Sequence, residues 1–185
     1  TPGLEFVIEG KVPAHGGEEV SVARLVGDST KHPDELWDEA RAEQDGEQGG
    51  RLYVHANAWA PEKWEYVLTE FDAGRSIRAS PWGLTFCGHV HTPSLYHMAS
   101  DDRVAAFEPV PGIDIPLGPQ RRWLAIPGSV GQPRDRNPAA AYTLFDSRLR
   151  QITFCRVTYD AGAAAAKIRG AGLPGSLAAR VEAGI

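Results

Sequence analysis

The hydrophobic pattern of the chain becomes regular from Arg51 onward. Short runs of β-prone residues, bounded by glycine, proline, aspartate or asparagine, predict strands. The predicted strands are Leu52–His55, Leu84–Cys87, Ser94–Met98, Ala105–Val110, Trp123–Ile126, Ala141–Phe145 and Ile152–Tyr159. The last two are separated by a polar turn at Asp146–Arg150 and therefore predict a β-hairpin.

Helices are fewer than strands in this pattern. Pro61 is expected to open a helix that ends near Gly74. Its apolar residues recur at helical spacing: Trp64, Val67, Leu68 and Phe71. Ala161–Ala171 is helical by propensity, and Leu173-Pro174-Gly175 separates it from a short terminal helix. Many strands with a few flanking helices predict helices layered on sheets.

Residues 1–50 are patterned more weakly. We expect a short strand at Leu4–Ile8, a helix at Pro33–Gln44 and a flexible loop at Gly46–Gly50. The first residue is Thr1, so either the chain was trimmed or the sequence begins inside a longer protein. We therefore divide the chain into a divergent or truncated segment, 1–50, and a main part, 51–185.

Composition and charge narrow the class of protein. The 185 residues (20.0 kDa) are 42% hydrophobic and 23% charged, which is ordinary for one globular domain. No apolar run approaches the ~20 residues of a membrane helix. Two cysteines favour a reducing compartment, and we expect a cytoplasmic location.

Acidic residues are concentrated at the start of the chain. Residues 1–50 carry 12 acidic and 4 basic side chains, whereas residues 51–185 carry 12 and 15. No dense Lys/Arg stripe is present, so we expect no nucleic-acid partner and no membrane, while a small anionic substrate remains compatible. The sequence leaves the oligomeric state open.

Three histidines are candidate metal ligands. His89 and His91 follow a predicted strand and Gly88, and His55 ends another predicted strand. Neutral imidazole binds Zn, Mn, Fe or Ni, and a turn at Gly88 would allow both neighbouring rings to reach one point. Each feature also has a plain interpretation, because loop histidines are commonly solvent-exposed and a lone histidine at a strand end is commonly structural.

A glycine-rich loop, 126–134, is the third feature. Its candidate contacts to an anion are Ser129, Gln132 and Arg134. Taken alone, this segment is more typical of a Pro/Gly surface loop.

In their order along the chain, these features resemble the calcineurin-like metallophosphoesterase family, in particular its bacterial single-domain branch. The matching motifs are Tyr53-Val54-His55-Ala56-Asn57, Gly88-His89-Val90-His91 and Pro127-Gly128-Ser129-Val130-Gly131-Gln132-Pro133-Arg134-Asp135. The resemblance runs from about Glu43 to the C-terminus. It implies an α/β (α+β layered) fold, a double β-sandwich flanked by helices, which the short N-terminal part would leave incomplete.

The resemblance also implies a function, the hydrolysis of a phosphate mono- or diester by two divalent metal ions (Mn, Fe, Zn or Ni). His55 and His89 would share one ion and His91 would hold its neighbour, ~3.5–4 Å away. Asn57, Ser129, Gln132 and Arg134 would contact the substrate, which would be a small phosphorylated molecule or a phosphoprotein.

The N-terminal part departs from the family pattern. The sequence contains no Asp-x-His and no Asn-His pair, and only His15 and Asp28 echo the missing ligands. Pro13 stands where the family has an aspartate. The alternative hypothesis is therefore a non-catalytic remnant of the same fold that acts as a binding or structural domain.

Three further expectations concern other residues. We expect His97 to take no part in metal binding. We expect Cys87 and Cys155 to be free, buried structural thiols. We expect substrate specificity to lie in Ala99–Gln120, which reads as a loop-rich insertion.

Overall fold

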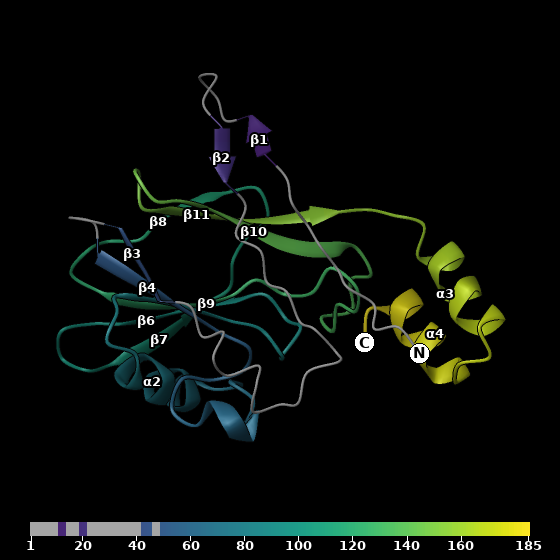
Figure 1. Ribbon diagram of the computed structural model, residues 1–185, viewed down its shortest axis with the longest axis horizontal. Coiled ribbons are helices and arrows are strands. Elements are labelled where there is room, and N and C mark those ends of the chain that lie inside the picture. Colours follow the sequence, from purple (N-terminus) through teal and green to yellow (C-terminus); the bar gives the residue numbers. More distant parts are fainter. Residues whose placement is uncertain (1–10, 14–18, 22–41, 46–48) are drawn as a thin grey trace.

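The fold is taken from a computed structural model, which describes residues 11–13, 19–21, 42–45 and 49–185, with side chains from Gly50 onward. Near the N-terminus, the short strands β1 (Lys11–Pro13) and β2 (Glu19–Ser21) form an antiparallel pair of their own. The larger part of the structure consists of two further sheets and the helices around them (Figure 1).

The larger sheet has six strands in the order β3-β4-β5-β9-β6-β7. Strands β4, β5 and β9 run parallel to one another, and the remaining pairings are antiparallel. The strands are β3 (Ala42–Asp45), β4 (Gly49–Val54), β5 (Leu84–Cys87), β9 (Arg122–Ile126), β6 (Ser94–Met98) and β7 (Val104–Phe107).

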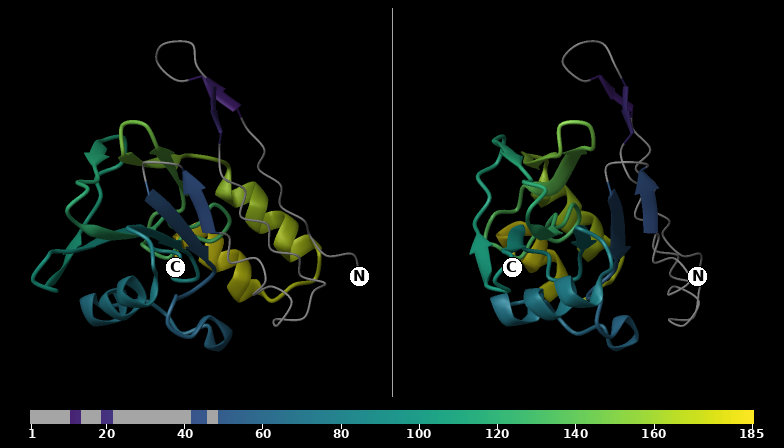
Figure 2. Two further views of the ribbon diagram at one scale, coloured as in Figure 1. Left: turned by 60° about the vertical axis from the view of Figure 1, so that its left-hand side comes forward. Right: turned by 90° about the vertical axis from the view of Figure 1, so that its left-hand side faces the viewer.

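The second sheet is antiparallel and has three strands in the order β10-β11-β8. They are β10 (Ala140–Asp146), β11 (Gln151–Val157) and β8 (Asp114–Pro116). Figures 1 and 2 show this sheet on one side of the six-stranded sheet and helix α2 (Glu70–Ala79) on the other. The protein is therefore layered as helix, sheet and sheet.

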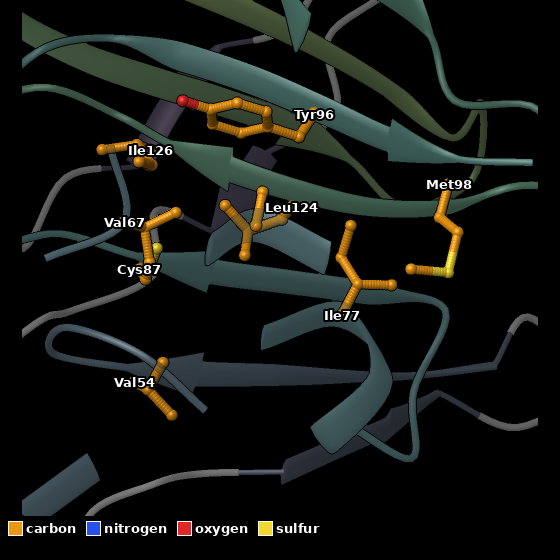
Figure 3. Packing of buried hydrophobic residues seen from close by; sticks show 9 residues of the cluster. Val54, Val67, Ile77, Cys87, Tyr96, Met98, Leu124 and Ile126 are labelled. Atoms are coloured by element: carbon orange, nitrogen blue, oxygen red, sulfur yellow. The ribbon is translucent and has the colours of Figure 1, made fainter. Parts of the chain in front are cut away.

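The protein has two hydrophobic cores, one on each face of the six-stranded sheet, because successive side chains of a strand point to opposite faces. On β9, Leu124 and Ile126 face α2, where they pack with Ile77 (Figure 3). Trp123 and Ala125 face the second sheet and pack with residues of β11. The six-stranded sheet is thus covered by apolar side chains on both faces.

The first helix begins later than predicted. Pro61–Lys63 forms only one 3₁₀ turn, which ends at Trp64 in a left-handed conformation (φ 53°). Helix α2 starts after Thr69, whose hydroxyl accepts the Asp72 N–H while the Asp72 carboxylate accepts the Thr69 N–H. This capping box outweighs the apolar spacing, and Leu68 and Phe71 are exposed. The predicted start at Pro61 and the predicted end near Gly74 are therefore both wrong, and only Glu70–Gly74 of the predicted range lies in α2.

The two C-terminal helices confirm the prediction for that part of the chain. Helices α3 (Ala161–Gly170) and α4 (Gly175–Ala183) pack against each other at one end of the layers (Figure 1). Arg169 donates two hydrogen bonds to the Glu182 carboxylate, at 2.9 and 2.6 Å. Just past α4, the Gly184 carbonyl accepts the Arg136 N–H at 2.7 Å, which joins the C-terminus to the loop before β10.

The predicted strands after residue 50 are all present, with small differences at their ends, and the predicted fold class of helices layered on sheets is confirmed. Strand β8 was not predicted. Residues 42–44 belong to β3, so the end of the predicted helix Pro33–Gln44 is wrong, and Leu4–Ile8 lies outside the described residues. Gly49 and Gly50 belong to β4, so the end of the predicted loop Gly46–Gly50 is wrong. A Cβ on Gly50 would clash with the Trp82 ring, so only glycine fits there.

Most of the region Ala99–Gln120 is turn or irregular structure, as expected of a loop-rich segment, and its role in substrate specificity stays a prediction. It contains β7 and β8, which form edge strands of the two sheets. The turn that joins β6 to β7 is closed by a hydrogen bond of 3.0 Å from the Ala99 N–H to the Arg103 carbonyl.

Both cysteines are free thiols, but they differ in burial. Cys87 is buried, and burial raises the pKa of its thiol to about 12. Cys155 is only half-buried, so its predicted burial is wrong. On β11 the neighbouring Phe154 takes the inward position, and Cys155 therefore points outward, opposite Tyr142.

Within the described residues, no helix has both the length and the apolar character needed to cross a membrane.

Replacing Leu124 with Ala should lower the free energy of unfolding by about 2–5 kcal/mol, because the side chain is fully buried at the centre of the sheet. The matched control is Leu149→Ala in the exposed β10–β11 turn, which should change it by less than ~0.5 kcal/mol. Urea denaturation measures both. Equal midpoints for the two variants would contradict this account of the core.

Native protein should react with a thiol reagent at Cys155 only. Thiolate is the reactive form, and Cys87 is both buried and held protonated. Mass spectrometry after brief labelling should find one adduct in the wild type and none in Cys155→Ser. An adduct on Cys87 before unfolding would contradict the packing described above.

Candidate metal centre

Two of the three candidate ligands meet at the carboxyl ends of two parallel strands of the larger sheet. His55 and His89 follow the parallel strands β4 and β5, in which Val54 lies opposite Cys87. The pairing extends beyond the strands, because the Gly88 N–H donates to the His55 carbonyl at 2.8 Å. The side chains of the two histidines then lie together, with His55 Nε2 and His89 Nδ1 3.0 Å apart.

The backbone turns sharply at the second histidine motif. His89 and His91 both have φ 66°, in the left-handed region that non-glycine residues rarely adopt. The Val90 N–H donates to the Gly88 carbonyl at 2.7 Å and closes the turn. Rare backbone conformations of this kind cluster at functional sites, since they persist only where the surrounding structure enforces them.

His91 is oriented by the glycine-rich loop. Its Nδ1 donates to the Gln132 carbonyl at 2.8 Å, which leaves Nε2 with the free lone pair. The Arg134 N–H also donates to the His91 carbonyl, at 3.2 Å. The sequence-predicted loop and the histidine motif therefore form one unit.

The loop is also held together internally. The Ser129 hydroxyl accepts the Gln132 N–H at 3.0 Å, and Gln132 Oε1 accepts Arg134 Nε and Nη2 at 3.3 and 2.9 Å. Gly128 has φ 93°, and a Cβ there would lie 2.7 Å from that of Ala141. Only glycine fits, so the loop has one defined path.

Asn57 has a structural place in this arrangement. It is fully buried, its Nδ2 donates to the Glu65 carbonyl at 3.1 Å and its Oδ1 accepts the Ala60 N–H at 2.8 Å. Its amide thus shapes the loop after His55. His15 and Asp28 lie outside the described residues.

Two aromatic residues lie against the histidine pair, and neither is among the residues predicted for the site. Trp64 lies against His55, with ring centroids 4.3 Å apart, and Tyr66 stacks on His89 at 4.3 Å and an interplanar angle of 24°. The left-handed end of the 3₁₀ turn places Trp64 here. In the sequence, the only signal was a cluster of aromatic residues after Pro61.

The site favours neutral imidazoles. Burial, and then the proximity of His89 and His91, lowers the pKa of His55 from 6.5 to about 4. The pKa of His89 is lowered by burial, His91 and Arg134. Burial and the charge of Arg134 also lower the pKa of His91, although its hydrogen bond to the Gln132 carbonyl acts in the opposite direction. Neutral imidazole is the form that binds metal ions.

The histidine pair fits one metal ion, although it does not complete a centre. The two rings form a hydrogen bond at 3.0 Å, and two nitrogens bound to one tetrahedral zinc ion would have a similar separation, about 3.3 Å. Within the described part of the chain, no group of three or more His, Cys, Asp or Glu residues lies close enough to hold an ion. His91 is thus a neighbour of the pair and not its third member, and no carboxylate ligand joins the pair among the residues that the structure describes.

His97 lies elsewhere in the fold. It is on β6, where Arg121 Nη1 donates to its Nε2 at 3.3 Å and the Trp123 ring lies 5.2 Å away. Strand β6 runs antiparallel to β9, so β6 and the turn at Ala99–Arg103 end where β9 begins. His55 lies at the other end of these strands, after β4.

Comparisons with known proteins agree with this description of the fold. No family model matches the chain. A metallophosphoesterase structure from Sphaerobacter thermophilus superposes with a TM-score of 0.69 and 33% identity, over 82% of this chain and 61% of that one. The crystal structure of a hypothetical protein from Pyrococcus horikoshii superposes with a TM-score of 0.54 and 17% identity, over 76% of this chain and 48% of that one.

A curated relative, an uncharacterized protein of Methanocaldococcus jannaschii, is 33% identical over 138 residues, which are 72% of this chain and 51% of the relative. The chain thus spans about half the length of the curated relative it matches. The protein has a metallophosphoesterase-like fold, as the resemblance in the sequence predicted.

The stability of the protein should fall as the pH drops from about 6.5 to about 4. In this range His55 gains a proton in the unfolded chain but not in the folded one, so acid favours unfolding. His55→Gln should flatten this dependence relative to wild type. Urea midpoints between pH 7 and pH 4.5 measure it, and an equally steep dependence in the variant would contradict the burial of His55.

Proposed function

We propose that the protein is a metal-dependent phosphoesterase that hydrolyses a phosphate mono- or diester. The observation that carries the proposal is the separation of 3.0 Å between His55 Nε2 and His89 Nδ1 at the ends of two parallel strands. In this proposal the pair holds one divalent ion (Mn, Fe, Zn or Ni), and His91 Nε2 holds a second.

Each remaining part of the site has a role in the proposal. A divalent ion supplies a Lewis acid for the phosphoryl oxygens and lowers the pKa of bound water. Arg134, fixed by its bonds to Gln132, binds the negative phosphate through its guanidinium. The neutral histidines add no competing positive charge.

The activity is proposed for the whole protein, because the chain spans 61% of the metallophosphoesterase it resembles. Carboxylate ligands would come from the part outside the described residues. The substrate would be a small phosphorylated molecule or a phosphoprotein. A reducing, cytoplasmic setting belongs to the same proposal, and the free thiols support it.

A second candidate is a non-catalytic domain with the same fold. Its supporting observation is that no three-ligand group occurs among the residues the structure describes. In this case the histidines would bind at most one weakly held ion.

Metal content and hydrolysis together distinguish the two candidates. Purified protein, incubated with Mn²⁺ and desalted, should retain one to two ions per chain by elemental analysis and hydrolyse bis-p-nitrophenyl phosphate. His55→Gln and His89→Ala should reduce Mn²⁺ affinity at least about tenfold, since each removes a ligand of the proposed shared ion.

His97→Gln is the matched control, because His97 is also a partly exposed histidine after a buried strand position but lies away from the pair. Its metal content and rate should stay within about twofold of wild type. A metal-free, inactive wild type would favour the non-catalytic domain. An equal loss of metal in all three variants would count against the assigned ligands.

A further inference from the structure

The surface next to the histidine pair carries one side chain that the fold itself does not need. Tyr66 is 43% exposed although one face of its ring is covered by His89. Part of the Tyr66 side chain is therefore accessible to solvent beside the histidine pair. An exposed aromatic face beside a site for an anion is a common means of recognising a flat ring.

The backbone holds Tyr66 in place from both sides. The preceding residue, Glu65, accepts the Trp59 Nε1–H at 3.1 Å, pairs with Arg75 at 3.7 Å, and bonds through its carbonyl to Asn57. The following residue, Val67, is buried in the core. The backbone on both sides of Tyr66 is thus held, and the ring itself rests on His89, so its freedom before binding is reduced.

The position of Tyr66 relative to the charged groups defines the ligand. Its ring centroid is 4.3 Å from that of His89, and the Arg134 N–H donates to the carbonyl of His91, two residues after His89, at 3.2 Å. A phosphoryl group bound at the histidines would therefore have Tyr66 beside its ester substituent.

We propose that Tyr66 is a specificity-determining residue that stacks against a planar aromatic substituent of the phosphate ester. A nucleobase and a simple aryl group share this chemistry. The inference rests on the proposed function, because it assumes that the phosphoryl group binds at the histidines.

Binding of phosphonates tests the inference, since their C–P bond is not hydrolysed. Isothermal titration in the presence of Mn²⁺ would compare propylphosphonate, phenylphosphonate and the 5′-methylenephosphonate analogue of adenosine monophosphate. At least one aromatic ligand should bind about tenfold more tightly than propylphosphonate. If only one of the two aromatic ligands binds more tightly than propylphosphonate, its aromatic group is the one recognised.

Variants assign the gain to Tyr66. Tyr66→Phe should keep the preference and Tyr66→Leu should reduce it to about twofold or less, with propylphosphonate binding unchanged in both. Phe71→Leu is the matched control, because Phe71 is a nearby exposed aromatic residue, 71% exposed, on α2. It should keep the full preference.

The possible failures are distinguishable. If inorganic phosphate and propylphosphonate bind but the aromatic ligands gain nothing, or if Tyr66→Leu keeps the preference, the role of Tyr66 is overturned and the phosphoesterase proposal stands. If neither inorganic phosphate nor any phosphonate binds, the proposed function fails, and the inference fails with it.

Discussion

The site depends on one backbone hydrogen bond, from the Gly88 N–H to the His55 carbonyl at 2.8 Å. It continues the parallel pairing of β4 and β5 one step beyond the strands, so two histidines that are 34 positions apart follow adjacent strand ends. Adjacent strands lie ~4.8 Å apart, which imidazole side chains easily bridge.

The arrangement around this bond serves the same chemistry. The two left-handed residues in the second motif turn the chain, and the Gln132 carbonyl fixes the His91 ring. Burial lowers the pKa of all three histidines, so they stay neutral next to Arg134. Such an arrangement stabilises neutral nitrogen donors beside a positive charge, which suits a metal ion and a phosphate better than it suits a packed core.

Most strands of the fold and the pairing of two histidines were predictable from the sequence, and the features that were not have physical reasons. The bounds of strands β5 and β6 match the prediction, because a short apolar run between turn residues is typical of a buried strand. The pairing of His55 with His89 followed from their place after such runs. Helix α2 was predicted to start too early, because the capping box at Thr69 acts more strongly than periodicity. Tyr66 was missed because its role depends on contact across the fold, which no local pattern encodes.

The central claim is that the His55–His89 pair binds a divalent metal ion. The direct measurement is a crystal structure of the protein with Mn²⁺, using anomalous scattering at the manganese edge to locate the ions. The account predicts an anomalous peak within bonding distance of both His55 Nε2 and His89 Nδ1, at about 2.0–2.2 Å. A direct hydrogen bond between the two rings in saturating Mn²⁺, with no peak beside them, would contradict it.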